Sequence, residues 1–194
     1  MTAPPNPDYP VRLEIDYAER PSRLSTFFRG LLVIPHLIVL TFVGIGSLFA
    51  ILVAWFAVLF TGRFPRGLFD FIVGVIRWGA RVTAYMFLMT DRYPPFALAD
   101  DPGYPVRLEI DYPEQMENWR PLVNWLLVIP FGYAASGLLF AAYFVVMVAW
   151  FAIVFTGRYP EGMFDFVTIP VRWSVRHTAY AYFMVDKYPP FEWA

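Results

Sequence analysis

An internal repeat constrains this chain more than any other feature. The segment Tyr9–Tyr17 recurs letter for letter as Tyr104–Tyr112, an offset of 104 − 9 = 95 residues. Continued without a gap as far as Phe96, this alignment covers 88 positions, and 42 of them are identical. Identity over such a length indicates that one unit was duplicated.

The duplication predicts the domain organisation. We expect a first repeat at residues 1–96, a linker at 97–103 and a second repeat at 104–194. Two like units in one chain usually pack about a pseudo-twofold axis, as the subunits of a dimer do. Any single matching residue can serve the fold or a function, so charged residues retained within apolar stretches are the informative ones.

The composition predicts a membrane protein. Hydrophobic residues make up 58% of the chain and charged residues 16%, whereas about 25% of a soluble domain is charged. A chain of this size cannot bury so much apolar surface in water, so a bilayer is the expected solvent. The net charge of −1 provides no basic footprint for nucleic acid. The absence of cysteine excludes disulfides and thiolate sites.

Each repeat opens with a segment that alternates apolar and polar residues, the pattern of a half-buried strand. The two copies are Tyr9–Tyr17 and Tyr104–Tyr112. A lone strand leaves backbone groups unpaired. We therefore expect the copies to pair as a small surface sheet that ties the repeats together. The alternative is an open edge that recruits a strand from a partner.

A long apolar helix is predicted next in each repeat, at residues 31–60 and 125–155, where no formal charge occurs. Thirty helical residues would extend about 45 Å, more than the hydrocarbon core of about 30 Å. We expect one tilted or kinked membrane helix, with Pro35, Gly44 and Gly46 as kink points. Two shorter helices are the alternative.

A turn of sequence Thr-Gly-Arg-aromatic-Pro follows at residues 61–65 and 156–160, and it is expected to end each long helix. Its arginine and aromatic residue suit the level of lipid headgroups. We predict interfacial turns there, carried by Thr61, Arg63, Thr156 and Arg158. A phosphate-binding turn is the alternative, although Thr-Gly-Arg alone does not define one.

The last predicted helix of each repeat, at residues 68–90 and 163–185, is amphipathic. Asp70, Arg77 and Arg81 are spaced by seven and four residues and share one helix face. The second copy repeats this pattern with Asp165, Arg172 and Arg176. Charges at membrane depth are costly and usually functional, so these six residues form a candidate functional polar face. The helix either spans with its charges turned inward or lies in the interface.

If all four long segments span, both termini lie on one side of the membrane. The basic residues of that side are Arg12, Arg20, Arg23, Arg29, Arg92, Arg107, Arg120 and Lys187. The turns on the other side carry Arg63, Arg66 and Arg158. The positive-inside rule then predicts a multi-pass protein with both termini in the cytoplasm. No cleavable signal peptide is expected, because acidic residues interrupt the arginines that precede the first helix.

Several motifs occur once per copy. They are the strand, a long helix with an early proline, Trp-Phe-Ala before Thr-Gly-Arg, then Phe-Asp-Phe, Arg-Trp and Asp-Arg/Lys-Tyr-Pro-Pro-Phe. This pattern resembles an uncharacterised bacterial membrane protein family, a domain of unknown function, over nearly the whole chain. The resemblance implies a small inner-membrane protein and brings no activity or substrate. The second copy departs at residues 115–125, so Arg20, Arg23 and Arg29 are expected to act only once.

No catalytic, cofactor or metal site is predicted. His36 and His177 have no counterpart in the other copy, and no glycine-rich phosphate loop, serine elbow or zinc motif occurs. Glu14 and Asp16 resemble a catalytic carboxylate pair. They lie on one strand face beside Arg12, where a solvated or salt-bridged face explains them. We therefore expect no enzyme and no cofactor.

Three functional classes follow for an all-α membrane protein of two repeats. The first is a structural or accessory protein, a scaffold or small subunit that contacts membrane lipids within a homo-oligomer or larger complex. The second is a small channel or transporter lined by the Asp/Arg faces between the repeats, although two two-helix units leave few helices for alternating access. The third is a lipid-binding or membrane-shaping protein that uses its amphipathic helices.

Overall fold

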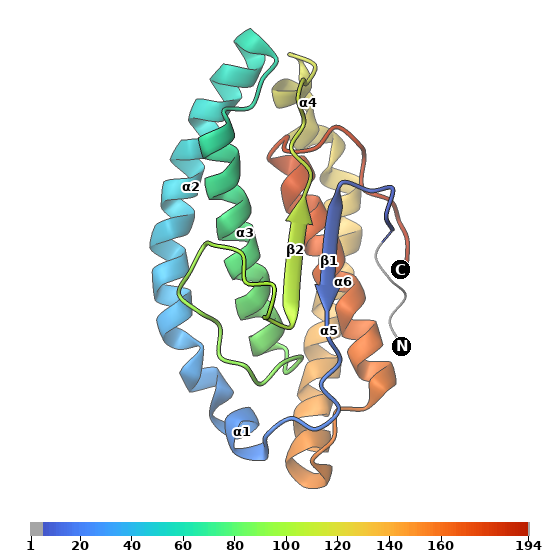
Figure 1. Cartoon of the computed structure of the whole chain (residues 1–194). Helices are drawn as coiled ribbons and strands as arrows, with labels where there is room; N and C mark the ends of the chain where they lie inside the picture. The colour runs from blue at the N-terminus through green and yellow to red at the C-terminus, as the bar shows by residue number, and fades with distance from the viewer. Residues whose placement is uncertain (1–5, 194) are drawn as a thin grey trace.

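The computed structural model describes residues 6–193 and shows two strands and six helices in that part of the chain. They are β1 (Val11–Ile15), α1 (Arg23–Leu32), α2 (Ile34–Thr61), α3 (Arg66–Met86), β2 (Val106–Ile110), α4 (Arg120–Leu127), α5 (Ile129–Thr156) and α6 (Glu161–Ala181) (Figure 1). The order strand, short helix, two long helices occurs twice. The duplication in the sequence is therefore a duplication of structure.

Strands β1 and β2 pair antiparallel, with Leu13 opposite Leu108. Because Leu108 is itself the copy of Leu13 in the second repeat, the register is symmetric about this pair. An antiparallel pair with such a register has its twofold axis normal to the sheet. The pseudo-twofold axis of the molecule therefore passes between Leu13 and Leu108. The prediction that the two strands pair and join the repeats is confirmed.

The sheet has one buried face and one charged face. Val11, Leu13, Val106 and Leu108 are at most 2% exposed. They pack on the helices beneath the sheet, β1 against α6 and β2 against α3 (Figure 1). The strand of each repeat thus completes the core of the other repeat. This exchange makes the two repeats one folding unit.

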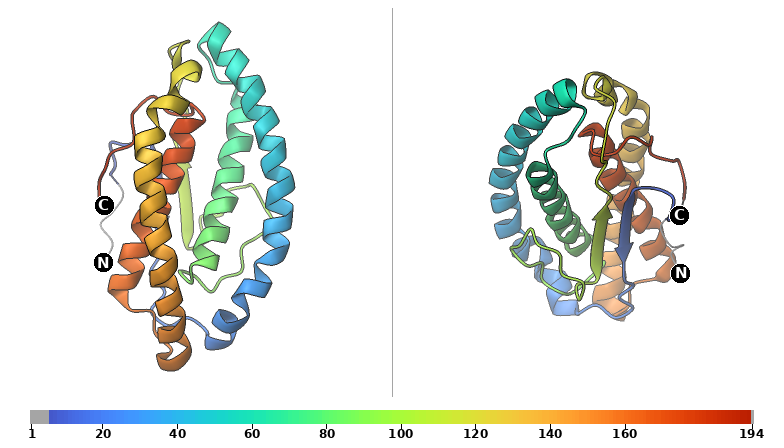
Figure 2. Two further views of the ribbon diagram at one scale, coloured as in Figure 1. Left: turned by 180° about the vertical axis from the view of Figure 1, so that it is seen from behind. Right: turned by 45° about the horizontal axis from the view of Figure 1, so that its top comes forward.

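Helices α2 and α5 flank the molecule and run in opposite directions (Figures 1 and 2). Both are long and apolar enough to cross a membrane, and only 11% and 17% of the most apolar window of each is buried. A core helix of a soluble protein is mostly buried, and these two are not. Phe42, Phe49 and Phe60 of α2 are 71%, 67% and 75% exposed.

The predicted long helix of each repeat is one unbroken helix, α2 or α5, and a short helix that was not predicted precedes it. A turn at Val33 separates α1 from α2, and one at Val128 separates α4 from α5. Pro35 and Pro130 lie in the first turn of α2 and α5. Proline lacks the N–H that would continue the preceding helix, and its ring clashes with the carbonyl four residues earlier. The glycines at 44 and 46, expected as kink points, lie within an unbroken α2.

The amphipathic helices end four residues earlier than predicted, at Met86 and Ala181. Each is followed by a residue with positive φ, Leu88 at 65° and Phe183 at 46°. Left-handed backbone stops a helix, and hydrophobic patterning alone does not reveal it because both residues remain buried.

The two Thr-Gly-Arg turns lie at opposite ends of the molecule, since α2 and α5 are antiparallel (Figure 1). The sequence-based count of basic residues required both turns on one side of four spanning segments. The structure differs from that arrangement. Because the strands pair antiparallel, the pseudo-twofold axis is perpendicular to α2 and α5 and not parallel to them, and it therefore places their two turns at opposite ends.

Candidate functional site

The retained arginines of the predicted polar face lie at the interface between the repeats. Arg77 Nε donates to the carbonyl oxygen of Leu108 at 3.3 Å, and Arg172 Nε donates to that of Leu13 at 3.1 Å. These two contacts are symmetry equivalents. Each arginine therefore fastens the central residue of the other repeat's strand.

The second arginine of each copy is buried under a tyrosine of the other repeat. Arg81 is 0% exposed and stacks 5.4 Å from the ring centre of Tyr104. Arg176 is 2% exposed and stacks 5.2 Å from that of Tyr9. Both tyrosines begin a strand segment, and cation–π contacts in a desolvated site can each contribute about 2 kcal/mol. The four arginines thus hold the strand segments of the sheet against α3 and α6.

The two aspartates of the predicted face differ, since Asp165 interacts electrostatically with Arg172 whereas Asp70 faces outward. Asp70 is exposed in the first part of α3, and Asp165 is half-buried. The structure thus brings together Arg77, Arg81 and their copies but not Asp70. Because the arginines contact strand carbonyls and tyrosine rings, their geometry serves the joint between the repeats.

Salt bridges cover the exposed side of the sheet. Arg12 lies 2.6 Å from Asp111 and 3.3 Å from Glu109. The copies repeat this, with Arg107 2.8 Å from Asp16 and 3.2 Å from Glu14. The neighbouring guanidinium lowers the pKa of Asp16 and that of Asp111. The carboxylates that resemble a catalytic pair are therefore held as salt-bridge partners.

The Thr-Gly-Arg turns close the long helices as predicted. Gly62 and Gly157 are left-handed C-caps with φ of 65° and 74°. Thr61 and Thr156 accept hydrogen bonds from the backbone amides of the arginines that follow, at 3.2 and 3.3 Å. The other repeat holds each turn, since the Tyr112 hydroxyl donates to Phe64 O and the Tyr17 hydroxyl donates to Tyr159 O, both at 2.5 Å.

Replacing Gly62 by alanine is expected to destabilise the protein by about 1–3 kcal/mol, because a side chain in left-handed backbone is strained. A β-carbon there would also lie 2.9 Å from the backbone oxygen of Met116. Thermal unfolding in detergent micelles, followed by circular dichroism, measures the effect. Gly67→Ala is the control, because Gly67 has open space around it. Equal melting temperatures for both variants would contradict the strain argument.

An arginine–aspartate pair that was not predicted from the sequence links each short helix to the segment that follows the amphipathic helix of the same repeat. Arg29 is 2% exposed, donates to the carbonyls of Tyr85 and Thr90 at 3.2 and 3.0 Å, and pairs with Asp91. In the second repeat Asn124 stands at the equivalent position and donates to Tyr180 O at 3.2 Å.

In the second repeat the arginine that pairs with the aspartate lies one helical turn earlier than Arg29 does in the first. Arg120, at the position of Ser25, donates to the backbone oxygen of Asp186 at 2.7 Å and lies 3.6 Å from its carboxylate. The expectation that Arg29 acts only once is thus corrected. The signal in the sequence was the aspartate retained at 91 and 186, combined with an exchange of arginine between positions four residues apart.

His36 belongs to an aromatic cluster. It is 0% exposed, stacks on Phe96 with ring centres 3.9 Å apart and accepts a 3.2 Å hydrogen bond from Trp78 Nε1. Phe131 takes the same place in the second repeat, against Trp173. His177 also packs within the protein, because a β-carbon on Gly132 would lie 2.7 Å from its Nε2. Within residues 6–193, no group of three or more His, Cys, Asp or Glu is placed to hold a metal.

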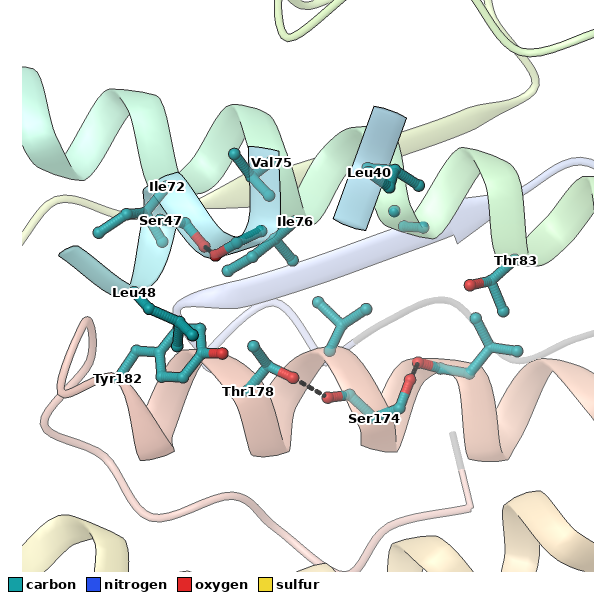
Figure 3. A pocket seen from close by; sticks show the side chains of 15 residues that line it. Leu40, Ser47, Leu48, Ile72, Val75, Ile76, Thr83, Ser174, Thr178 and Tyr182 are labelled. Atoms are coloured by element: carbon teal, nitrogen blue, oxygen red, sulfur yellow. Dashed lines mark hydrogen bonds between the residues drawn. The ribbon is translucent and has the colours of Figure 1, made fainter. Parts of the chain in front are cut away.

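A groove of about 470 Å³ opens between α2, α3 and α6, on the side away from the sheet (Figure 3). Apolar side chains and hydroxyls line it. The hydroxyls of Ser47, Ser174 and Thr178 donate to carbonyls of their own helices at 2.7, 2.7 and 2.9 Å. The apolar lining of the groove, with these three hydroxyls turned to their own helices, suits an apolar chain.

Comparison with known proteins identifies one family. The family model described as Domain of unknown function (DUF4389) matches residues 23–97 and matches again at residues 118–192. Each match runs from the short helix to the segment after the amphipathic helix and leaves out the exchanged strands. No curated protein and no solved structure matches the chain.

Proposed function

We propose that this chain, which belongs to the DUF4389 family and carries its domain twice, is a non-enzymatic structural protein of a membrane. It lies in one face of the bilayer, with its sheet in water and α2 and α5 in hydrocarbon. One observation carries the proposal: the pseudo-twofold axis is normal to the charged sheet and crosses the directions of α2 and α5 (Figures 1 and 2).

The helices α2 and α5 can either cross the bilayer or lie in its plane. If α2 and α5 crossed the bilayer end to end, the sheet beside their middle would lie at mid-depth (Figure 1). Its outer face carries Arg12, Glu14, Asp16 and their three copies, and charges at that depth cost several kcal/mol each. If the helices lie in the membrane plane instead, the same charges face water and the exposed phenylalanines of α2 face lipid.

This orientation favours a scaffold that shapes or occupies one leaflet. Each of the two long helices has 28 residues, a length of about 42 Å along the membrane plane. Both Thr-Gly-Arg turns then lie at the headgroup level, one at each end of the molecule. The water-facing sheet is the surface for a protein partner or a second copy. The channel alternative needs the spanning orientation together with an oligomer that shields the sheet.

Cysteine labelling tests the orientation in a chain that has no cysteine of its own. We expect Arg63→Cys and Arg158→Cys to react with a membrane-impermeant maleimide from the same side, because in-plane helices keep both turns on one face. Right-side-out and inside-out vesicles are labelled in parallel. Glu109→Cys, on the sheet surface, is the control and must react from that same side.

Labelling of the two turns from opposite sides would overturn the proposal, since antiparallel spanning helices place their ends in different compartments. Protection of Glu109→Cys from both sides would add that the sheet is shielded. That result would favour the channel.

A further inference from the structure

We infer that the end of the molecule where α1 meets the end of α5 binds the phosphate of an anionic phospholipid, with an acyl chain in the adjoining groove. The inference deepens the proposed function and rests on it, because both require that these two helices contact lipid. Three arginines, Arg20, Arg23 and Arg158, surround a recess of about 390 Å³ there.

The guanidinium groups of this recess are available to a ligand. Within residues 6–193, the side chains of Arg23 and Arg158 have no hydrogen bond or ion pair, and Arg20 Nε is 3.7 Å from Glu19 Oε1. Arg23 lies across the end of α5, with Nε 3.1 Å from where a β-carbon on Gly157 would stand. A glycine is what lets this arginine approach. Arginine binds phosphate oxygens bidentately, which suits a headgroup.

An apolar groove of about 480 Å³ adjoins the recess, between α1 and α5, and Phe27, Met147 and Phe151 line it. Phe27 follows Arg23 by one turn of α1, and Phe151 precedes the turn at Thr156 by little more than one turn of α5. The groove and the recess therefore lie along the same two helices. A phosphate among the arginines would leave its acyl chain directed toward the groove.

The other repeat shows that the fold does not need these arginines. Gln115 and Asn118 stand at the positions of Arg20 and Arg23. Asn118 Nδ2 donates to Leu59 O at 2.9 Å and so closes the end of α2. An amide is sufficient for that structural task, and an arginine at position 23 adds a positive charge that has no ion pair within residues 6–193.

Acidic side chains lie near the arginines at both ends of the molecule. Glu19 and Glu161 both interact electrostatically with Tyr17, beside the arginine recess. At the opposite end Arg63 and Arg66 share their recess with Glu114, and Arg66 is stacked over Tyr112 at 4.5 Å. Among these side chains, the end with Arg20, Arg23 and Arg158 therefore carries one more arginine and one more glutamate than the opposite end, and within residues 6–193 neither Arg23 nor Arg158 stacks on a ring as Arg66 does.

The test replaces two arginines at this end by the residues found at the equivalent positions of the second repeat. The R20Q/R23N variant introduces the counterpart residues, which the fold already accepts. The protein in neutral detergent micelles is offered equal amounts of phosphatidylglycerol and phosphatidylcholine, and bound lipid is counted by native mass spectrometry. We expect the wild type to prefer phosphatidylglycerol and the variant to lose about 30-fold in affinity, from about 1 kcal/mol per arginine.

R63Q/R66Q is the matched control, because it removes two positive charges from the opposite end, and it is expected to bind nearly as the wild type does. Equal losses in both variants, or equal binding of the two lipids by the wild type, would overturn the inference. So would full displacement of phosphatidylglycerol by inorganic phosphate, which would indicate a soluble anion as the ligand. Micelles impose no orientation, so this test can fail while the in-plane proposal stands, and the converse also holds.

Discussion

Leu108→Ala is expected to lower the free energy of unfolding by about 2–5 kcal/mol, the range for removing a fully buried leucine side chain. Leu108 is 1% exposed and pairs with Leu13 on the pseudo-twofold axis, where the two repeats meet. The loss therefore affects the packing of both repeats together. Thermal and denaturant unfolding in micelles, followed by tryptophan fluorescence, measures it.

Leu13→Ala should have a similar effect because it occupies the equivalent position. The loss of unfolding free energy in the double variant should differ from the sum of the two single losses, because contacting residues are energetically coupled. Glu109→Ala, one residue away on the exposed face, is the control and should change stability by no more than about 0.5–1 kcal/mol, the value of an exposed ion pair. A Leu108 variant as stable as this control would show that the exchanged strands do not hold the repeats together.

Arg29→Asn is expected to destabilise the protein by about 3 kcal/mol, the lower end for removing one partner of a buried ion pair. The lower end applies because the Asp91 side chain is 32% exposed and water can partly solvate it. The substitution also leaves the carbonyl of Thr90 without its arginine donor. Thermal unfolding in micelles gives the measurement.

The second repeat supplies a rescue for this variant. S25R/R29N reproduces the arrangement of Arg120 and Asn124, in which the arginine lies one turn earlier and still reaches the aspartate. Stability should return to within about 1 kcal/mol of the wild type. If the double variant were as unstable as Arg29→Asn alone, the two arrangements would not be equivalent, and Arg29 would have a role of its own.

Several elements were predictable because their causes are local or repeated. The recurrence of Tyr9–Tyr17 at Tyr104–Tyr112 predicted two strands, and the unpaired backbone of each predicted that they pair. Gly62 and Gly157 ended their helices as expected, because left-handed backbone after a helix favours glycine wherever it occurs. Apolar length alone marked α2 and α5 as candidate membrane spans.

The positions of the arginines were only half predictable. Helical spacing correctly placed Arg77 and Arg81 on one side of α3, and likewise their copies on α6. That spacing could not show what they contact, because the strand beneath which they lie belongs to the other repeat. The replacement of Arg29 by Arg120 escaped detection for a related reason: a residue-by-residue alignment compares positions, whereas the aspartate can be reached from either of two successive turns.

The sequence by itself determined that one unit occurs twice, that each unit holds one strand and two long helices, and that its longest helices are apolar. These properties follow from local backbone preferences and from side-chain periodicity, which depend only on residues near each other in the sequence. Only the tertiary structure decided that each strand packs on a helix of the other repeat, that α2 and α5 run antiparallel, and that three arginines gather at one end. Those outcomes depend on which distant surfaces bury each other, and the free energy of that packing is not a property of any single segment.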